Sequence, residues 1–435
     1  MRRILFVLIV LWAESLSAQT LEDQMRDMRA EIQQLRQELN GLKQELRDRS
    51  PIIEEVPVIQ AQVQEHAQTK VETSAKFPMK IFGTIVSNTF WNSGEPNWLD
   101  IPNIAQPSIA GLKPGSFSSS LRQSRIGANL EGPEVFGMKI NGTIAMDFFG
   151  GIPNFPTGQV MALPRLLYGY VRLDGEKTAV EIGQDSMVLA PKNPTSLLGT
   201  AFPTLYRSGN LYLRAPQIRV ERVLASGDSG QIRAVGGIMA PVAGDLSSGA
   251  GSSYQFVPPN LAGERSSTPA VQSRLSWRAA PAGPYEQPQW EFGVSGHYGR
   301  ERYTNAVLPS WAASTDFDVT SGKLGMGGEY FIGRNLAAFG GSIAQLAKSQ
   351  GGFIEGRLAA TPRLSFNGGY GTDHLFDFVK FPAPLSRNGT FFVNSIYNFT
   401  PEFRGAFEYQ RLSTQPVAGS IRRNNHLNLT FAYSF

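Results

Sequence analysis

Charged side chains recur through the second part of this 435-residue chain, in segments where every second residue is apolar. The cations that stand out are Arg122, Arg125, Arg172, Lys192, Arg207, Arg214, Arg219, Arg233 and Arg274, and the acids are Glu131, Asp147 and Glu221. Charges that line a narrow aqueous passage set the energy barrier for the ions that cross it. The chemistry expected of this set is therefore electrostatic and not covalent.

The charge balance of this wall does not by itself favour either sign. The alternate positions between the apolar residues also hold Arg278, Arg357, Arg363 and Arg404, together with Glu291, Asp316, Asp318, Glu355 and Glu408. If the stretch from Pro191 to Pro203 folds inward, we expect a cationic constriction that faces an acidic side. Its members would be Lys192 and Arg207 at the base of the stretch and Arg122, Arg125 and Arg214 on neighbouring strands. The alternative is that these arginines only pair with acids of the wall.

Composition gives little support to catalysis. The chain has 4 His and 0 Cys, so cysteine nucleophiles, disulfides and thiolate metal sites are excluded. His297, His374 and His426 show no metal-ligand spacing, and no glycine-rich phosphate-binding motif occurs. Basic residues are dispersed among acids, which argues against nucleic-acid binding. We therefore expect no enzyme, no cofactor and no metal site.

Alternation of apolar and polar residues from residue 77 onward predicts the elements that position these charges. Residues 138–148 and 427–435 each place apolar side chains on one face and polar ones on the other, which is the pattern of a half-buried strand. Each such segment can supply the roughly 9–11 residues of a tilted membrane strand. We expect an all-β transmembrane barrel of about 16 antiparallel strands in residues 77–435. A soluble β-sandwich is the alternative.

Short turns and long loops alternate between these segments, as in barrels whose turns face the periplasm. The expected turns are Gly132-Pro133-Glu134, Gly175-Glu176, Gly227-Asp228, Pro281 to Pro284, Gly333-Arg334, Thr361-Pro362 and Thr400-Pro401. The expected loops are 92–117, 150–163, 190–208, 241–268, 302–313 and 373–388, with shorter ones near 350 and 416. Pro216 within a strand further suggests a bulge that turns Arg214 and Arg219 inward.

The end of the chain carries alternating aromatic residues, Phe431, Tyr433 and Phe435. A terminal aromatic with aromatics two and four positions before it resembles the recognition signal of outer-membrane barrels. We therefore expect the barrel-assembly machinery to be a partner.

The N-terminal region has a different period. Leu21, Met25, Met28, Ile32, Leu35, Leu39, Leu42 and Leu46 alternate in spacings of four and three, which is the heptad repeat of a coiled coil. Glu31 and Glu38 would face Arg36 and Lys43 of a neighbouring helix, so we expect residues 19–50 to self-associate in parallel. The heptads do not fix the number of helices. A single amphipathic helix is the alternative. We expect residues 51–76 to be a linker, in which Gln60 to Lys76 are either a second short helix or a flexible tether.

The first residues resemble a secretory signal peptide. Arg2 and Arg3 precede an apolar run from Ile4 to Ala13, and small residues end at Ala18. The run is shorter than the roughly 20 residues of a membrane-spanning helix. We expect cleavage after residue 18, a barrel in the outer membrane in contact with its lipid, and the coiled coil in the periplasm.

Three stretches resemble porins of the DcaP type: RQSRIG at 122–127, EIGQDSMVLAPKNPTSL at 181–197 and GNLYLRAPQIRVE at 209–221. Phosphate-selective porins of the O/P type are a near alternative. The resemblance implies a homotrimer of 16-stranded barrels that passes small, often anionic, solutes. The functional hypothesis is a porin for passive diffusion of small hydrophilic solutes. The alternative is a structural envelope protein that tethers the outer membrane through its coiled coil.

Overall fold

The computed structural model describes residues 26, 30, 33–41, 78–150, 162–228, 230–241, 263–279, 288–303, 306–336, 341–343, 346–377 and 384–435. The chain divides into two compact units, Met1–Lys76 and Phe77–Phe435, and each is described by itself. Within the described ranges, no helix is long and apolar enough to cross a bilayer.

The described part of the first unit is helical over residues 33–41. Leu35 and Leu39, one turn apart, expose 57% and 53% of their surface. Gln34 Nε2 donates a hydrogen bond to Glu38 Oε1 over 3.5 Å. The other expected heptad positions, the signal segment and the linker lie outside the described residues.

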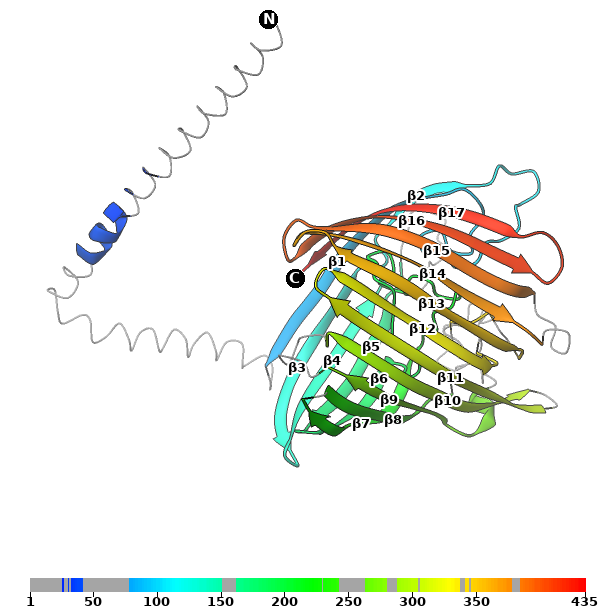
Figure 1. Cartoon of the computed structure of the whole chain (residues 1–435), viewed down its shortest axis with the longest axis horizontal. Helices are drawn as coiled ribbons and strands as arrows, with labels where there is room; N and C mark the ends of the chain where they lie inside the picture. Colours follow the sequence, from blue (N-terminus) through cyan, green and yellow to red (C-terminus); the bar gives the residue numbers. More distant parts are fainter. Residues whose placement is uncertain are drawn as a thin grey trace, which may run out of the picture. The chain divides into compact units, whose positions relative to one another are not determined.

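The second unit is a single antiparallel sheet of 17 strands, joined to itself (Figure 1). The strands are β1 Met79–Asn92, β2 Ser116–Ser120, β3 Arg125–Val135, β4 Met138–Asp147, β5 Arg165–Asp174, β6 Thr178–Ser186, β7 Arg214–Gly227, β8 Gly230–Met239, β9 Ala270–Arg278, β10 Trp290–Tyr303, β11 Ala306–Ser321, β12 Leu324–Arg334, β13 Lys348–Ala359, β14 Leu364–Leu375, β15 Leu385–Asn398, β16 Phe403–Pro416 and β17 Arg422–Ser434. A short 3-10 helix, η2 Glu264–Ser266, precedes β9.

Pairing of the first and last strands closes the barrel. β1 runs antiparallel to β17, from Thr84 opposite Ser434 to Asn92 opposite His426. Its other edge pairs with β3 over its first half and with β2 over its second half. β2 and β3 therefore share one position in the wall, interrupted at residues 121–124. The 17 strands fill 16 positions, which confirms the expected barrel.

Side-chain alternation explains why these segments became strands of a membrane barrel. On β13, Ile354 exposes 51% of its surface while the next residue, Glu355, exposes 2%. Phe407 and Glu408 on β16 show the same contrast. Apolar residues thus point outward, where lipid would surround them, and polar residues point into the barrel. This sorting makes a one-residue slip of register costly, because it would turn every side chain of a strand to the wrong face.

The terminal strand ends on the first one. The Phe435 amide donates to the Gly83 carbonyl, and the Gly83 amide donates to the Phe435 carbonyl, each over 3.0 Å. Phe431, Tyr433 and Phe435 are all exposed on the outer face. The Phe431 ring stacks near Phe403, with ring centroids 6.0 Å apart.

Four of the expected short turns lie where the sequence places them. Gly175-Glu176 joins β5 to β6, Gly227-Asp228 lies at the end of β7, Thr361-Pro362 precedes β14 and Thr400-Pro401 precedes β16. The expected turn at Pro281 to Pro284 lies outside the described residues.

Two of the expected turns and one of the expected loops were wrong. Gly132-Pro133-Glu134 lies within β3, where the register with β4 shifts between Glu131 and Glu134. A bulge accepts proline because its extra residue makes no ladder hydrogen bond, and the turn itself is at Phe136 and Gly137, both with positive φ. Gly333-Arg334 ends β12, whereas the short turn is 322–323 and the long connection is 335–347. The expected loop 302–313 is largely strand, because β10 reaches Tyr303 and β11 starts at Ala306.

Gly183 provides a test of the wall near the inner charges. Its φ is +138°, and a Cβ there would lie 2.2 Å from the Gly169 carbonyl oxygen of β5. We predict that Gly183→Val destabilises the barrel, since such backbone strain costs about 1–3 kcal/mol before the clash is added. The measurement is the temperature at which the folded band converts to the unfolded band in semi-native electrophoresis.

Gly236→Val on β8 is the matched control, because nothing lies within 4 Å of a Cβ at Gly236. Equal conversion temperatures for the two variants would show that the backbone at Gly183 is not constrained as described.

Candidate functional site

One long segment crosses the inside of the barrel. We call residues 187–213, between β6 and β7, the inner loop. The amides of Val188 and Leu189 donate to Gln272 Oε1 of β9 over 2.8 and 3.0 Å. Farther along, the Thr195 amide donates to Glu355 Oε2 of β13 over 2.8 Å. Because these acceptors lie on the polar face of well-separated strands, the inner loop must run through the interior.

Apolar contacts fix the same path. Leu197 packs with Ile396 of β15 and Ala406 of β16. Farther along the loop, Leu205 packs with Phe353 and Phe392. At Gly209, where φ is +93°, a Cβ would lie 2.1 Å from the Gly352 carbonyl oxygen, so the loop backbone touches the wall directly. The inner loop is therefore packed like a core element and narrows the bore.

Buried carboxylates of the wall hold this loop. Glu329 of β12 accepts from the Lys192 amide, and Glu291 of β10 accepts from Lys192 Nζ over 2.6 Å. Glu408 of β16 accepts from Ser196 Oγ over 2.5 Å. With Glu355, these acids lie behind the loop. The expectation of an acidic side that faces the cations across the constriction is thus wrong for these residues, since their carboxylates are hydrogen-bonded to the loop.

A second set of charges forms a network on β5 to β8. Arg172 Nη2 lies 2.8 Å from Glu221 Oε2, and Arg219 Nη2 lies 2.9 Å from Glu181 Oε2. Arg233 also pairs with Glu221. These three arginines, which were not among the expected constriction residues, are thus paired with acids of the wall.

The remaining expected cations, on and near β9 to β14, differ in their partners. Arg274 pairs with Asp316 over 2.6 Å and with Glu291 over 2.9 Å, and Arg357 pairs with Asp318 over 2.7 Å. Arg278 donates to the Gln231 side chain instead. Arg363 is exposed in the turn before β14, so its expected place on the inner wall is wrong.

An aromatic cluster joins the inner loop to the first two long loops. Its buried members include Phe149, Phe202, Tyr206 and Tyr212, and Trp98 packs against it. Two arginines lie on it. Arg122 Cζ is 3.8 Å from the Phe149 ring centroid and pairs with Asp100. Arg165 Cζ is 4.7 Å from the Phe202 centroid and pairs with Asp147 over 2.9 Å.

Four arginines differ from all of these. Among the described residues, no carboxylate forms an ion pair with Arg125, Arg207, Arg214 or Arg404, and their Nε atoms are buried without a hydrogen-bond partner. Arg214 Cζ lies 4.9 Å from the ring centroids of both Tyr168 and Tyr212. The charges of Arg125 and Arg214 repel each other, and the Asp147 carboxylate attracts both without forming an ion pair with either.

Tyr212 does not neutralise this pair of cations. Burial raises the pKa of the Tyr212 hydroxyl, although the nearby Arg214 guanidinium acts in the opposite direction. The phenol is thus neutral at ordinary pH, and its ring contributes only a cation–π contact to Arg214.

The structure does not bring all expected residues together. Glu131 is exposed near the turn end of β3 and pairs with Lys139 over 3.0 Å, apart from the inner charges. The expected bulge at Pro216 is wrong, because the β6–β7 register is continuous there; the shift in β7 lies between Val223 and Ala225.

Sequence reasoning missed Asp100, Arg165 and Glu181. Glu181 alternates with the outward Ile182, so parity could have found it. Parity could not place Arg165, because the register between β4 and β5 shifts at Leu167. Asp100 lies in a long loop without any period.

A closed 16-position barrel with a loop packed inside it is the fold of an outer-membrane porin. No family model matches the sequence, and no curated protein does. The barrel is similar to the outer membrane channel DcaP of Acinetobacter baumannii, with a TM-score of 0.63 and 14% identity over 82% of this chain and 97% of that one. It is also similar to OprB of Pseudomonas putida, with a TM-score of 0.54 and 12% identity over 85% and 97% of the two chains.

An anion-selective porin from Comamonas acidovorans is a third similar structure, with a TM-score of 0.52 and 10% identity over 82% of this chain and 99% of that one. The DcaP-type resemblance of the three sequence stretches is confirmed at the level of the fold. Two of those stretches, 181–197 and 209–221, contain both ends of the inner loop.

Release of the inner loop should widen the passage. Glu355→Ala combined with Glu408→Ala removes three hydrogen bonds from Thr195 and Ser196, each worth about 1.5–3 kcal/mol when one partner is charged. We predict a larger and noisier single-channel conductance in planar bilayers.

Glu131→Ala is the control, since it removes a carboxylate from an exposed pair that does not touch the loop. A conductance unchanged in the double variant would mean that these contacts do not keep the loop in the bore.

Proposed function

We propose that this chain is an outer-membrane porin that passes small hydrophilic, preferentially anionic, solutes by diffusion. The observation that carries the proposal is that the acids of the inner wall have hydrogen-bond partners, whereas several of its arginines have no carboxylate partner in the part of the chain that the structure describes. Carboxylates on β10, β12, β13 and β16 are engaged with the inner loop, whereas Arg125, Arg207, Arg214 and Arg404 have no carboxylate partner among the described residues. These four guanidinium groups thus add positive charge to the inner wall that no ion pair among the described residues balances.

Energetics supports a functional reading of these cations. Removing an unpaired charge from water costs several kcal/mol, and a ring contact such as that of Tyr168 returns about 0.5–2 kcal/mol. A barrel that only needed a stable interior would pair these guanidinium groups, as it does for Arg172 and Arg219. A passing anion can supply the missing partner for a short time, which lowers its barrier relative to a cation.

The proposal includes the arrangement expected from the N-terminal sequence. Residues 1–18 would be removed on export, residues 19–50 would form a periplasmic coiled coil that holds three barrels together, and residues 51–76 would link the two. The exposed Leu35 and Leu39 on the described helix are compatible with helix association. Phe431, Tyr433 and Phe435 would present the assembly signal.

Selectivity gives the direct test. We predict that Arg125→Ser combined with Arg214→Ser lowers the anion-to-cation permeability ratio at least tenfold, because a unit charge about 8 Å from an ion contributes roughly 2 kcal/mol at an effective dielectric constant of about 20, and about 1.4 kcal/mol is a factor of ten. The reversal potential in a salt gradient measures this ratio. Arg222→Ser, which removes an exposed cation at the far end of β7, should leave it unchanged.

Two results would count against this proposal, the first against its anion preference and the second against the porin itself. Cation preference of the unaltered channel would refute the assignment of the four arginines. Absence of conductance, together with retention of the protein on purified peptidoglycan, would favour the structural tether.

Self-association depends on the heptads in this proposal. We predict that Glu31→Lys combined with Glu38→Lys converts a trimer into single barrels, because like charges would then face Arg36 and Lys43. Native mass spectrometry of the mature protein in detergent measures the number of barrels per particle. Restoration of the trimer by Arg36→Glu combined with Lys43→Glu in the same chain would show that charge pairing, and not helix content, is responsible.

A further inference from the structure

The outer face of the barrel has a groove where two glycines replace side chains. Gly356 of β13 lies directly opposite Gly368 of β14. Met326 is opposite Gly356 on one side, and Val393 is opposite Gly368 on the other. Directly paired residues on one face are neighbours, so a row of outward side chains is interrupted for two positions. The resulting hollow has a volume of about 960 Å³.

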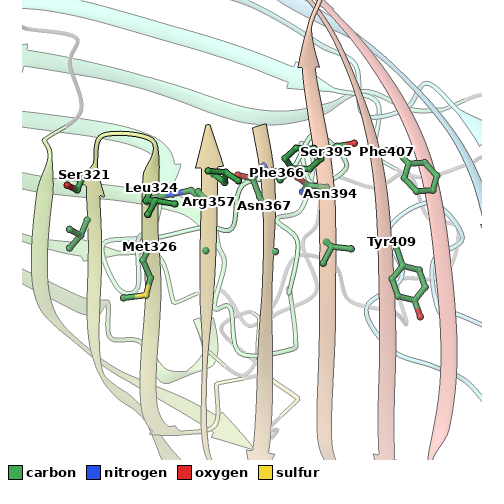
Figure 2. A pocket seen from close by; sticks show the side chains of 16 residues that line it. Ser321, Leu324, Met326, Arg357, Phe366, Asn367, Asn394, Ser395, Phe407 and Tyr409 are labelled. Carbon is green, nitrogen blue, oxygen red and sulfur yellow. Dashed lines mark hydrogen bonds between the residues drawn. The ribbon is translucent and has the colours of Figure 1, made fainter. Parts of the chain in front are cut away.

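Apolar side chains form the walls of this groove. The next row toward the short turns contains Leu324, Leu358, Phe366 and Phe407, with Ser395 between the two phenylalanines. Figure 2 shows Leu324, Met326, Phe366, Phe407 and Tyr409 around the hollow. Leu324, Met326, Phe366 and Phe407 are all exposed on the barrel. The groove is thus continuous with the outer apolar face, and its lining also includes the inward residues Arg357, Asn367 and Asn394.

The groove lies next to the short-turn end of the barrel. Leu324 immediately follows the 322–323 turn between β11 and β12. Tyr397, Phe399 and Phe403 form an aromatic group near the same end, with successive ring centroids 5.0 Å apart. Aromatic girdles mark the level of the membrane interface, so the groove is in the hydrocarbon layer just inside it.

Charges at this edge match a lipid headgroup. Lys323 and Arg363 are exposed in the turns next to the groove, and Glu402 is exposed in the β15–β16 turn. Lys323 Nζ donates to the Ala360 carbonyl over 3.4 Å, which holds it between two of these turns. Ser395 carries a hydroxyl in the apolar wall for which the described residues supply no hydrogen bond. Two cations, one carboxylate and one hydroxyl suit a phosphate, an ammonium group and an ester carbonyl.

We propose that this groove binds an acyl chain of a phospholipid of the periplasmic leaflet, with its phosphate near Lys323 and Arg363. Without a ligand, the two glycines would leave a void against the membrane, and walls of a void lose dispersion contacts. A flexible acyl chain fills an irregular hollow of this kind, whereas a rigid protein surface would need a matching projection.

Filling the groove tests the site. No atom lies within 4 Å of a Cβ at Gly356, so Gly356→Leu can occupy the hollow without a backbone clash. Gly236→Leu is the matched control, because Gly236 is also an exposed strand glycine with open space around it and lies on β8, outside the groove. The probe is palmitoyl-oleoyl phosphatidylethanolamine, titrated onto delipidated full-length mature protein and followed by native mass spectrometry.

We expect at least a tenfold weaker binding of one phospholipid per barrel in Gly356→Leu and unchanged binding in Gly236→Leu. Lys323→Gln combined with Arg363→Gln should weaken binding of the phospholipid but not of a diacylglycerol with the same chains. If Gly356→Leu does not assemble, Ser395→Leu fills the groove from the neighbouring row.

Equal binding by the Gly356 and Gly236 variants would overturn the proposal. A change in the number of barrels per particle on filling the groove would also overturn it, because the hollow would then be a contact between copies. Single-channel conductance of the same variants should equal that of the unaltered protein. Failure of the pore function would appear in that recording and leave the lipid measurement interpretable.

Discussion

Satisfaction of backbone hydrogen bonds without water is the constraint on which this barrel depends. Unpaired peptide groups are too costly in hydrocarbon, so a membrane sheet must have no free edge. The pairing of β1 with β17 removes both edges at once. The register of the ladder decides which side chains share a face, and the apolar pattern then decides which face points toward lipid. The inner charges, the loop that they hold and the outer groove all follow from this closure.

The inner wall shows how one type of side chain can serve different purposes according to its partner. Glutamates on β10 to β16 accept hydrogen bonds from the inner loop and so fix its backbone. Glutamates on β6 and β7 balance arginines within the wall. Net charge along the wall therefore says little about what a solute meets. The local excess at the narrowed part decides it, and this excess depends on which acids the loop has already engaged.

The fold could be predicted from the sequence because the alternation of apolar and polar residues is repeated along each strand. In residues 427–435, alternation alone predicts a strand and its outward face, and the structure has β17 over Arg422–Ser434. Turn positions were predicted less accurately, since Pro133 lies in a bulge and not in a turn. For the site, parity correctly grouped Arg172, Arg219 and Glu221. It could not show that Arg125 and Arg214 lack carboxylate partners, because this depends on a loop without periodicity and on aromatic rings distant in sequence.

The break between β2 and β3 limits how freely the wall can vary in length. Within residues 121–124 the chain leaves the ladder, and Gln123 Oε1 accepts from the Thr200 amide, the Thr200 hydroxyl and the Ala201 amide over 3.1, 2.8 and 3.2 Å. Ser124 Oγ accepts from the Val86 amide over 2.9 Å and so restores the next rung. Insertions in the exposed turn at residues 361–363 would extend into solvent at little cost. One extra residue between Leu121 and Ser124 would instead move Gln123, whose side chain joins the wall to the inner loop, so this four-residue gap has a fixed length.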